Sequence, residues 1–297
     1  MSANDRAGGG AIAAAFARCR EEGRAAFIPF LMAGDPDLET SERLVAALAE
    51  GGADLIELGV PFSDPIADGP VNQRAATRAL AAGTTLSRVL ELVARSRDRL
   101  GVPVVLFTYF NPIHARGVAS FAEQAASSGV DGVLCVDLPP EEAAAEYSPA
   151  LAAAGVDPVF LLAPTSDRER IAAVDRAASG FVYYVSRTGV TGERTELARE
   201  LVRGVKRARR RIHLPLAVGF GISTPEQVAA VGEIADGVVV GSALVAEVER
   251  RAGDPDLPAA LAARVRELAA PLHERGEEGL GGRLRALFGG GRAEARG

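Results

Sequence analysis

The sequence predicts an α/β protein built as a single (β/α)8 barrel, also called a TIM barrel. The chain has 297 residues, 48% of them hydrophobic, which suits one large domain with a full core. Short runs rich in Val, Ile and Leu alternate with segments whose apolar residues recur at spacings of three and four. Several of these runs begin in the same way, in GADLIELG, GVDGVLCVD, GVDPVFLL and ADGVVVG. Roughly eight strand–helix units favour a closed barrel over an open sheet.

Taken in order, the elements begin with an extra amphipathic helix over residues 11–22, which precedes the first strand. Eight apolar runs then predict the strands, over residues 26–32, 53–60, 102–109, 130–137, 156–162, 181–186, 214–219 and 236–240. Between them, groups such as Leu44, Val45 and Leu48 have the spacing of one helix face.

The chain is divided by this pattern into a barrel domain, residues 1–275, and a tail, residues 276–297. The tail is rich in Gly and Arg, and we expect it to be flexible and disordered.

Composition and charge exclude several classes of function. A net charge of −6 does not indicate a basic surface that would bind nucleic acid. The basic run of residues 203–211 is interpreted as a solvated helix face. No run approaches the ~18 apolar residues of a membrane span. Cys19 and Cys135 are far apart and lack CxxC spacing, so neither a disulfide framework nor a zinc site is indicated. We therefore expect a cytoplasmic protein that binds neither nucleic acid nor membrane.

The stretch ELGVPFSDPIADGP, residues 57–70, places three acids directly behind the apolar part of the second predicted strand. Strand alternation turns Ile56 and Leu58 toward the outer helices and Glu57 into the barrel. This position is near the carboxyl end of the strand, where active sites of this fold lie. Loss of solvation there raises the pKa of a carboxyl group, so Glu57 suits proton transfer near pH 7. Asp68, in the following loop, could reach back over the same mouth.

Each acid also has a structural interpretation. Glu57 could be a buried carboxyl group held only by hydrogen bonds. A single loop aspartate is by default a turn residue, so Asp64, between Ser63 and Pro65, is interpreted as a turn or interface residue.

Two loops near the end of the chain predict a phosphate site. After the seventh and eighth strands the sequence reads VGFGIS and VGSA, with glycine at each strand end and serine where a helix would begin. Backbone N–H groups at a helix start bind phosphate, and these are the loops that usually do so in this fold. Glycines at strand ends are also plain turn residues, so the prediction depends on the two loops together. The polar loop of residues 186–196 could close as a lid.

Absent residue types narrow the chemistry. Lys206 is the only lysine and lies in the basic helical run, so no barrel-facing lysine is available for a Schiff base. The three histidines, His114, His213 and His273, share no metal-ligand spacing with Cys, Asp or Glu, and we predict no metal site. Two inward carboxylates and a phosphate site favour proton transfer on a phosphorylated small molecule. If a carbon–carbon bond is cut, the leaving fragment must supply its own electron sink.

Six motifs carry a resemblance to a known family. They are PFLMAGDP (residues 29–36), ELGVPFSDPIADGP (57–70), YFNPI (109–113), VDLPPEE (136–142), SRTGVTG (186–192) and VGFGISTPEQV (218–228). In this order they closely resemble the tryptophan synthase α subunit, over about residues 10–270. The resemblance implies a lyase of tryptophan biosynthesis that cleaves indole-3-glycerol phosphate to indole and glyceraldehyde 3-phosphate, with no cofactor in this chain.

The resemblance also implies roles for individual residues. Glu57 would be the general acid and base, and Asp68 would stabilise charge at the indole N–H. Other matching positions are Gly192, Gly221, Gly241 and Ser242 for phosphate; Phe30, Leu134, Tyr183 and Phe220 for the indole pocket; and Arg187 and Thr191 in the closing loop, where Thr191 would meet Asp68. The family's frequent tyrosine two residues before Tyr183 is Phe181 here, a change expected to affect packing more than chemistry.

A partner is implied as well, a β subunit that carries pyridoxal phosphate, in an αββα heterotetramer. Asp64, Pro65, Pro139 and Pro140 match the side of the family that faces this partner. Two alternatives remain open: a stand-alone lyase that releases free indole, and a low-activity subunit that binds and activates its partner.

Overall fold

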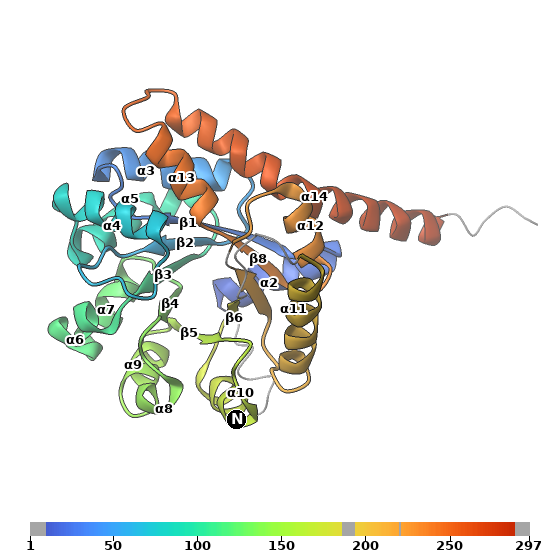
Figure 1. The fold of residues 1–297 in the computed structure, drawn as a ribbon, viewed down its shortest axis with the longest axis horizontal. Helices are drawn as coiled ribbons and strands as arrows, with labels where there is room; N and C mark the ends of the chain where they lie inside the picture. Colours follow the sequence, from blue (N-terminus) through green and yellow to red (C-terminus); the bar gives the residue numbers. More distant parts are fainter. Residues whose placement is uncertain (1–9, 186–193, 220, 289–297) are drawn as a thin grey trace, which may run out of the picture.

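The computed structural model describes residues 10–185, 194–219 and 221–288; for residues 194–200 and 276–288 it describes the backbone only. Eight parallel strands pair in chain order, and β1 (Ala26–Met32) pairs with β8 (Gly237–Val240) to close the barrel. Helices surround the strands on the outside, as Figure 1 shows. The predicted (β/α)8 barrel is confirmed.

Each predicted strand is present. Except for β1, each observed strand is shorter than its predicted range, by one to three residues at one or both ends. The remaining strands are β2 (Ile56–Gly59), β3 (Val104–Thr108), β4 (Gly132–Cys135), β5 (Asp157–Leu162), β6 (Val182–Val185) and β7 (Leu216–Gly219). They are buried almost throughout, because outer helices cover one face and the barrel core the other.

The helices follow the strands in the alternation that the sequence predicts. They are α2 (Ala11–Glu22), α3 (Leu38–Glu50), α4 (Pro70–Ala81), α5 (Leu86–Leu100), α6 (Phe110–Arg116), α7 (Val118–Ser127), α8 (Pro140–Ala143), α9 (Tyr147–Ala153), α10 (Arg168–Ala177), α11 (Arg194–Arg209), α12 (Pro225–Gly232), α13 (Ser242–Arg250) and α14 (Leu257–Phe288).

Helix α2 covers the amino-terminal end of the barrel. Its Ile12 lies so close to Gly132, the first residue of β4, that a Cβ there would sit 2.8 Å from the isoleucine Cδ1. Phe16 approaches Gly237, the first residue of β8, and packs on Phe181 with ring centroids 5.6 Å apart. The extra helix therefore closes the end opposite the strands' carboxyl ends. Phe181 takes part in this packing, as expected from its replacement of tyrosine.

Helix α14 packs against α3 and α12 and runs to Phe288. The sequence predicted a flexible tail from residue 276; the helix continues over residues 276–288 of that segment, and the division at this point stays a prediction. The reason lies in residue type: between its glycines, the segment contains Glu, Arg, Leu and Ala, which have high helix propensity. Residues 289–297 of the expected tail lie outside the described residues.

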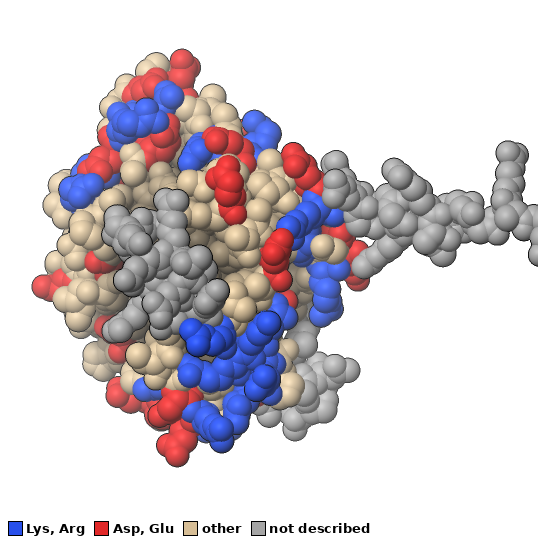
Figure 2. Space-filling view, turned by 45° about the vertical axis from the view of Figure 1, so that its right-hand side comes forward, with Lys and Arg blue, Asp and Glu red and all other residues tan. Residues whose placement is uncertain are grey.

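Charge is spread over the surface, with a local concentration of Lys and Arg on the face that Figure 2 shows. Helix α11 carries Arg203, Lys206 and Arg207, all exposed, as the interpretation of this run as a solvated helix face predicts. Arg207 donates to the carbonyl oxygen of Pro164 at 2.6 Å. Within the described ranges, no helix is long and apolar enough to cross a membrane.

Candidate active site

Glu57 lies inside the barrel on β2, as strand alternation predicts. It pairs in register with Phe30 of β1 and Val105 of β3, and it is only 1% exposed. Burial and, to a lesser degree, the charge of nearby Asp68 together raise the pKa of its carboxyl group to about 8. Among the described residues, Oε1 of Glu57 has no hydrogen-bond partner. Its carboxyl group is thus protonated for most of the time at pH 7, with one oxygen available to a ligand.

Asp68 lies in the loop between β2 and α4 and is held by neighbouring side chains. The hydroxyl of Tyr109 donates to Oδ2 of Asp68 at 2.8 Å and accepts from the backbone N–H of Ala67 at 3.1 Å. Burial raises the pKa of Asp68, while hydrogen bonds from Tyr109 and Asn72 oppose that rise. The structure therefore brings the two predicted acids together over one mouth, close enough for their charges to interact.

Apolar side chains surround Glu57. Phe30 packs edge-on against Phe107 with ring centroids 5.5 Å apart, and Leu134 of β4 pairs in register with Phe107. Tyr183 of β6 is buried, and its hydroxyl would lie 1.9 Å from a Cβ at position 219. Only glycine fits there. Phe30, Leu134 and Tyr183, three of the four residues predicted for the indole pocket, are thus buried in the same barrel core as Glu57, and their role in holding an indole ring stays a prediction.

Among the residues that the structure describes, no acceptor is found for the first backbone N–H groups of α13, which lie at the carboxyl ends of the strands. Gly241 follows β8 directly, and the helix's own hydrogen bonds begin with Leu244 and Val245, which donate to the carbonyl of Gly241 at 2.8 and 3.1 Å. The N–H groups of Ser242 and Ala243 precede these bonds, so they are the donors that a helix start presents to an anion.

The neighbouring helix start, on α12, is capped by its own side chains. Thr224 and Gln227 form a capping box that satisfies donors of that first turn. Gly221, in the loop before it, has a φ of +74°, a conformation that glycine adopts at little cost. Because β7 and β8 are adjacent, Gly221 and α13 flank the same side of the mouth.

Four predicted site residues lie outside the described residues. They are Gly192, Arg187, Thr191 and Phe220. Their predicted roles stay predictions.

The residues predicted to face a partner lie on loops at the same end of the barrel as the site. Asp64 is exposed and accepts from the hydroxyl of Ser63 at 2.7 Å, which is a turn contact. Pro65 and Pro139 are half-buried, whereas Pro140 is buried at the start of α8. Next to Pro65, the side chain of Ile66 is 88% exposed.

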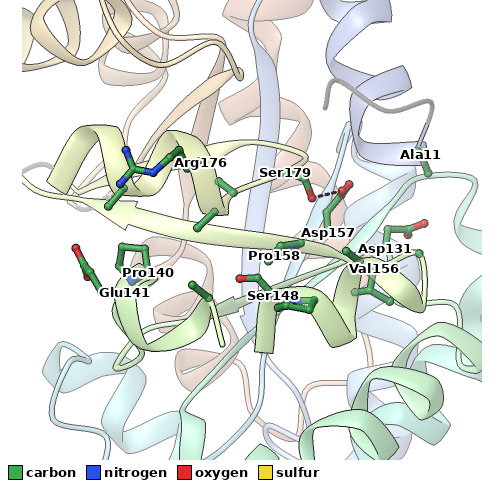
Figure 3. A pocket seen from close by; sticks show the side chains of 18 residues that line it. Ala11, Asp131, Pro140, Glu141, Ser148, Val156, Asp157, Pro158, Arg176 and Ser179 are labelled. Atoms are coloured by element: carbon green, nitrogen blue, oxygen red, sulfur yellow. Dashed lines mark hydrogen bonds between the residues drawn. The ribbon is translucent and has the colours of Figure 1, made fainter. Parts of the chain in front are cut away.

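A groove of about 730 Å³ lies on the outside of the barrel, between α8–α9 and α10 (Figure 3). Asp157 of β5 faces it and accepts from the hydroxyl of Ser179, while Pro140 and Arg176 lie toward its other end. Neither Glu57 nor Asp68 lines it, so it is separate from the candidate active site.

Sequence reasoning did not assign roles to Tyr109 or Asn72. Tyr109 belongs to the YFNPI motif, so the signal was present, but its contact with Asp68 spans 41 residues of sequence. The sequence also predicted neither a lysine that could form a Schiff base nor a metal site. Lys206 is exposed on α11, and no group of three metal-ligating side chains gathers in the part of the chain that the structure describes.

Comparison with known proteins identifies the family. The family profile described as tryptophan synthase alpha chain matches residues 16–273. A tryptophan synthase alpha chain of Citrifermentans bemidjiense is 58% identical over 238 residues, 80% of this chain and 89% of that protein. The corresponding chain of Geobacter sulfurreducens is 55% identical over 239 residues, again 80% of this chain and 90% of the relative.

Solved structures agree with the sequence comparison. The tryptophan synthase subunit alpha of Legionella pneumophila superposes with a TM-score of 0.82 at 37% identity, covering 89% of this chain and 99% of that chain. A Mycobacterium tuberculosis tryptophan synthase structure gives 0.80 at 39% identity, covering 88% and 98%. The chain belongs to the tryptophan synthase alpha chain family, and it is a lyase that cleaves indole-3-glycerol phosphate to indole and glyceraldehyde 3-phosphate in tryptophan biosynthesis.

Proposed function

We propose that Glu57 and Asp68 carry the cleavage of indole-3-glycerol phosphate by general acid–base chemistry. The observation that supports this most strongly is the buried Glu57 carboxyl group, which has a pKa of about 8 and one oxygen without a partner among the described residues. A group with such a pKa can give and take a proton near neutral pH.

The reaction proceeds in two proton transfers that balance. Protonated Glu57 gives its proton to C3 of the indole ring, and the ring becomes an iminium-like electron sink. Glu57, now ionised, takes the proton of the glycerol hydroxyl group next to the bond that breaks. The electrons of that bond return to the ring, so indole and glyceraldehyde 3-phosphate leave and Glu57 is protonated again. Because the ring supplies the sink, this chain needs neither a metal nor a cofactor.

Asp68 stabilises the positive charge that develops at the indole N–H. The hydrogen bond from Tyr109 at 2.8 Å fixes the orientation of its carboxylate. Phe30, Leu134 and Tyr183 hold the ring, and the free N–H groups of Ser242 and Ala243, with Gly221, bind the phosphate.

The partner is a β subunit that holds pyridoxal phosphate, in an αββα assembly. The name of the family, alpha chain, supports a beta partner. Asp64, Pro65 and Pro139 lie on loops beside the mouth, and the exposed Ile66 provides an apolar contact there. We place the reaction in the cytoplasm, where the two buried free thiols, Cys19 and Cys135, would stay reduced.

The test is the release of glyceraldehyde 3-phosphate from indole-3-glycerol phosphate by the purified chain, with and without an equimolar β subunit. Slow cleavage alone and strong acceleration by the partner would support the assembled enzyme. Full activity alone would indicate a stand-alone lyase. Absence of cleavage in both mixtures would contradict the roles of Glu57 and Asp68 and leave a binding and activating subunit.

A further inference from the structure

A network of charged side chains joins three segments that border the mouth of the barrel. Arg78 of α4 donates from Nε and Nη2 to the two carboxylate oxygens of Asp35, at 2.8 Å each, and from Nη1 to Glu249 of α13 at 2.7 Å. Arg74, one turn earlier on α4, binds both oxygens of Glu249 at 2.8 Å each. Five charge-assisted hydrogen bonds thus connect the segment after β1 with two helices.

The two helices that this network joins begin after β2 and β8, the two strands that flank β1, and each carries a different part of the candidate site at its start. Helix α4 begins at Pro70, two residues after Asp68, and α13 begins at Ser242, the proposed phosphate donor. The helices pack against each other. Arg74 and Arg78 are one turn apart on one face of α4, so their joint hold on Glu249 fixes how far α4 can slide along α13.

The carboxylate of Glu249 stays ionised near neutral pH. Arg74 and then Arg78 lower the pKa of Glu249 to about 2. Burial raises the pKa of Asp35, which is 3% exposed, and the bidentate contact with Arg78 opposes that rise. Paired arginine forks have little geometric freedom, so the network is a stiff connection.

We propose that Arg78 and Glu249 are positioning residues for catalysis: they hold α4 against α13 so that Asp68 and the phosphate-binding start of α13 keep the separation that one substrate molecule spans. This inference rests on the proposed roles of Asp68 and Ser242. The substrate is held at its phosphate and at its ring together, so a shift of about 1 Å between the two helix starts would cost up to about a hundredfold in rate.

The chain contains a matched control. Glu42 of α3 also bridges two arginines one turn apart, Arg95 at 2.9 Å and Arg99 at 2.5 Å, both on α5. Glu42→Gln and Glu249→Gln thus make the same chemical change in two similar networks. Of the two, the network of Glu249 joins the helices that carry the candidate site, whereas the network of Glu42 joins α3 and α5.

The experiment measures kcat, KM and Tm for Glu249→Gln and Glu42→Gln, each assembled with the β subunit. We expect Glu249→Gln to lower kcat by about tenfold or more, and Glu42→Gln to leave it within about twofold, at similar Tm changes. Inorganic phosphate, as a competitive inhibitor, should keep its inhibition constant in Glu249→Gln, since a ligand held at one end does not sense the separation. Equal kcat values in the two variants, or weakened phosphate inhibition in Glu249→Gln, would overturn the proposal.

A double-mutant cycle separates positioning from general loss of structure. In an Asp68→Asn background, Glu249→Gln should cost little more, because the group that it positions is already lost. A full, additive loss would overturn the positioning role. If Asp68→Asn alone has no effect, the proposed role of Asp68 fails first. Should Glu249→Gln fold poorly, Arg78→Lys replaces it in the cycle, because lysine keeps the charge but cannot form the same bidentate contact.

Discussion

At the scale of single residues, the environment of Glu57 explains its chemistry. A strand side chain that points into a closed barrel loses water, and no described residue compensates Oε1 with a hydrogen bond. The protein therefore stabilises the neutral carboxylic acid over the carboxylate. Such a group begins the cycle as an acid and not as a base, which is the order that protonation of the indole ring requires.

The first prediction concerns pH. Cleavage requires protonated Glu57, so kcat/KM should fall as pH rises through about 8, the pKa of this group. It also requires ionised Asp68, whose pKa is raised above the usual aspartate range, so the rate should fall on the acid side as well. A profile of kcat/KM against pH checks both limbs. An unchanged rate from pH 7 to 10 would exclude Glu57 as the acid.

The second prediction concerns Glu57→Gln. We expect this substitution to remove about a hundredfold or more of turnover, since general acid–base groups typically contribute that much. Asp68→Asn should cost less. The assay is steady-state cleavage with the β subunit present.

The thermal stability of Glu57→Gln at two pH values is the control that separates loss of the catalytic group from damage to the fold. The folded pKa of Glu57, about 8, is above its ordinary value of 4.5, so ionisation opposes folding and stability is lost as pH rises between these values. The glutamine variant escapes that cost, so its Tm at pH 9 should exceed that of the parent by at least about 5 °C. At pH 5 the two should be closer. A lower Tm at both pH values would mean that the lost activity reflects damage to the fold.

The third prediction concerns Tyr109→Phe. The tyrosine hydroxyl stabilises ionised Asp68, so its removal should raise the pKa of Asp68 further. The acid limb of the kcat/KM profile should then move to higher pH, while the alkaline limb stays in place. An acid limb that stays in place would contradict the requirement for ionised Asp68.

Part of this site could be predicted from the sequence. Strand alternation alone turned Glu57 inward, because the side-chain period of a strand is fixed. Contacts such as Arg78 with Asp35 and with Glu249 could not be predicted, because they join positions 43 and 171 residues apart in sequence. Their formation depends on how α4 and α13 pack, which no local pattern encodes.

At the scale of elements, β1 and α2 have the predicted bounds, whereas the end of α14 differs. A buried strand and an amphipathic helix are specified by local residue pattern, and so these could be predicted. The last residue of α14 is not specified in this way, because glycines that favour a tail alternate there with residues of high helix propensity.

The fourth prediction concerns α2. Phe16→Ala should lower the free energy of unfolding by about 3 kcal/mol, because it removes a buried ring between Phe181 and the start of β8. It should leave kcat nearly unchanged, since α2 lies at the end of the barrel opposite Glu57. Urea unfolding and the cleavage assay together check this. A large loss of kcat at unchanged stability would contradict the structural role.

At the scale of the whole molecule, one continuous core underlies the barrel and its helices. Side chains from α2 to Leu272 of α14 belong to a single buried cluster. The buried cluster extends from Ile12 to Leu272, and the prediction of a barrel domain over residues 1–275 stays a prediction.

The fifth prediction follows from that core. Thermal unfolding of the chain without its partner should be a single cooperative transition. Differential scanning calorimetry checks it by comparing the calorimetric with the van't Hoff enthalpy. Two resolved transitions would show that part of the chain unfolds independently.

Closure of the barrel between β1 and β8 also has a consequence during synthesis. The first strand leaves the ribosome long before residue 240, the end of its last neighbour, has been translated. Until then one edge of β1 has unpaired backbone groups, which can pair with other nascent chains. Helix α2 meets α14 later still. Closure of the barrel thus has to wait for the last strand, and until then the growing polypeptide exposes a strand edge.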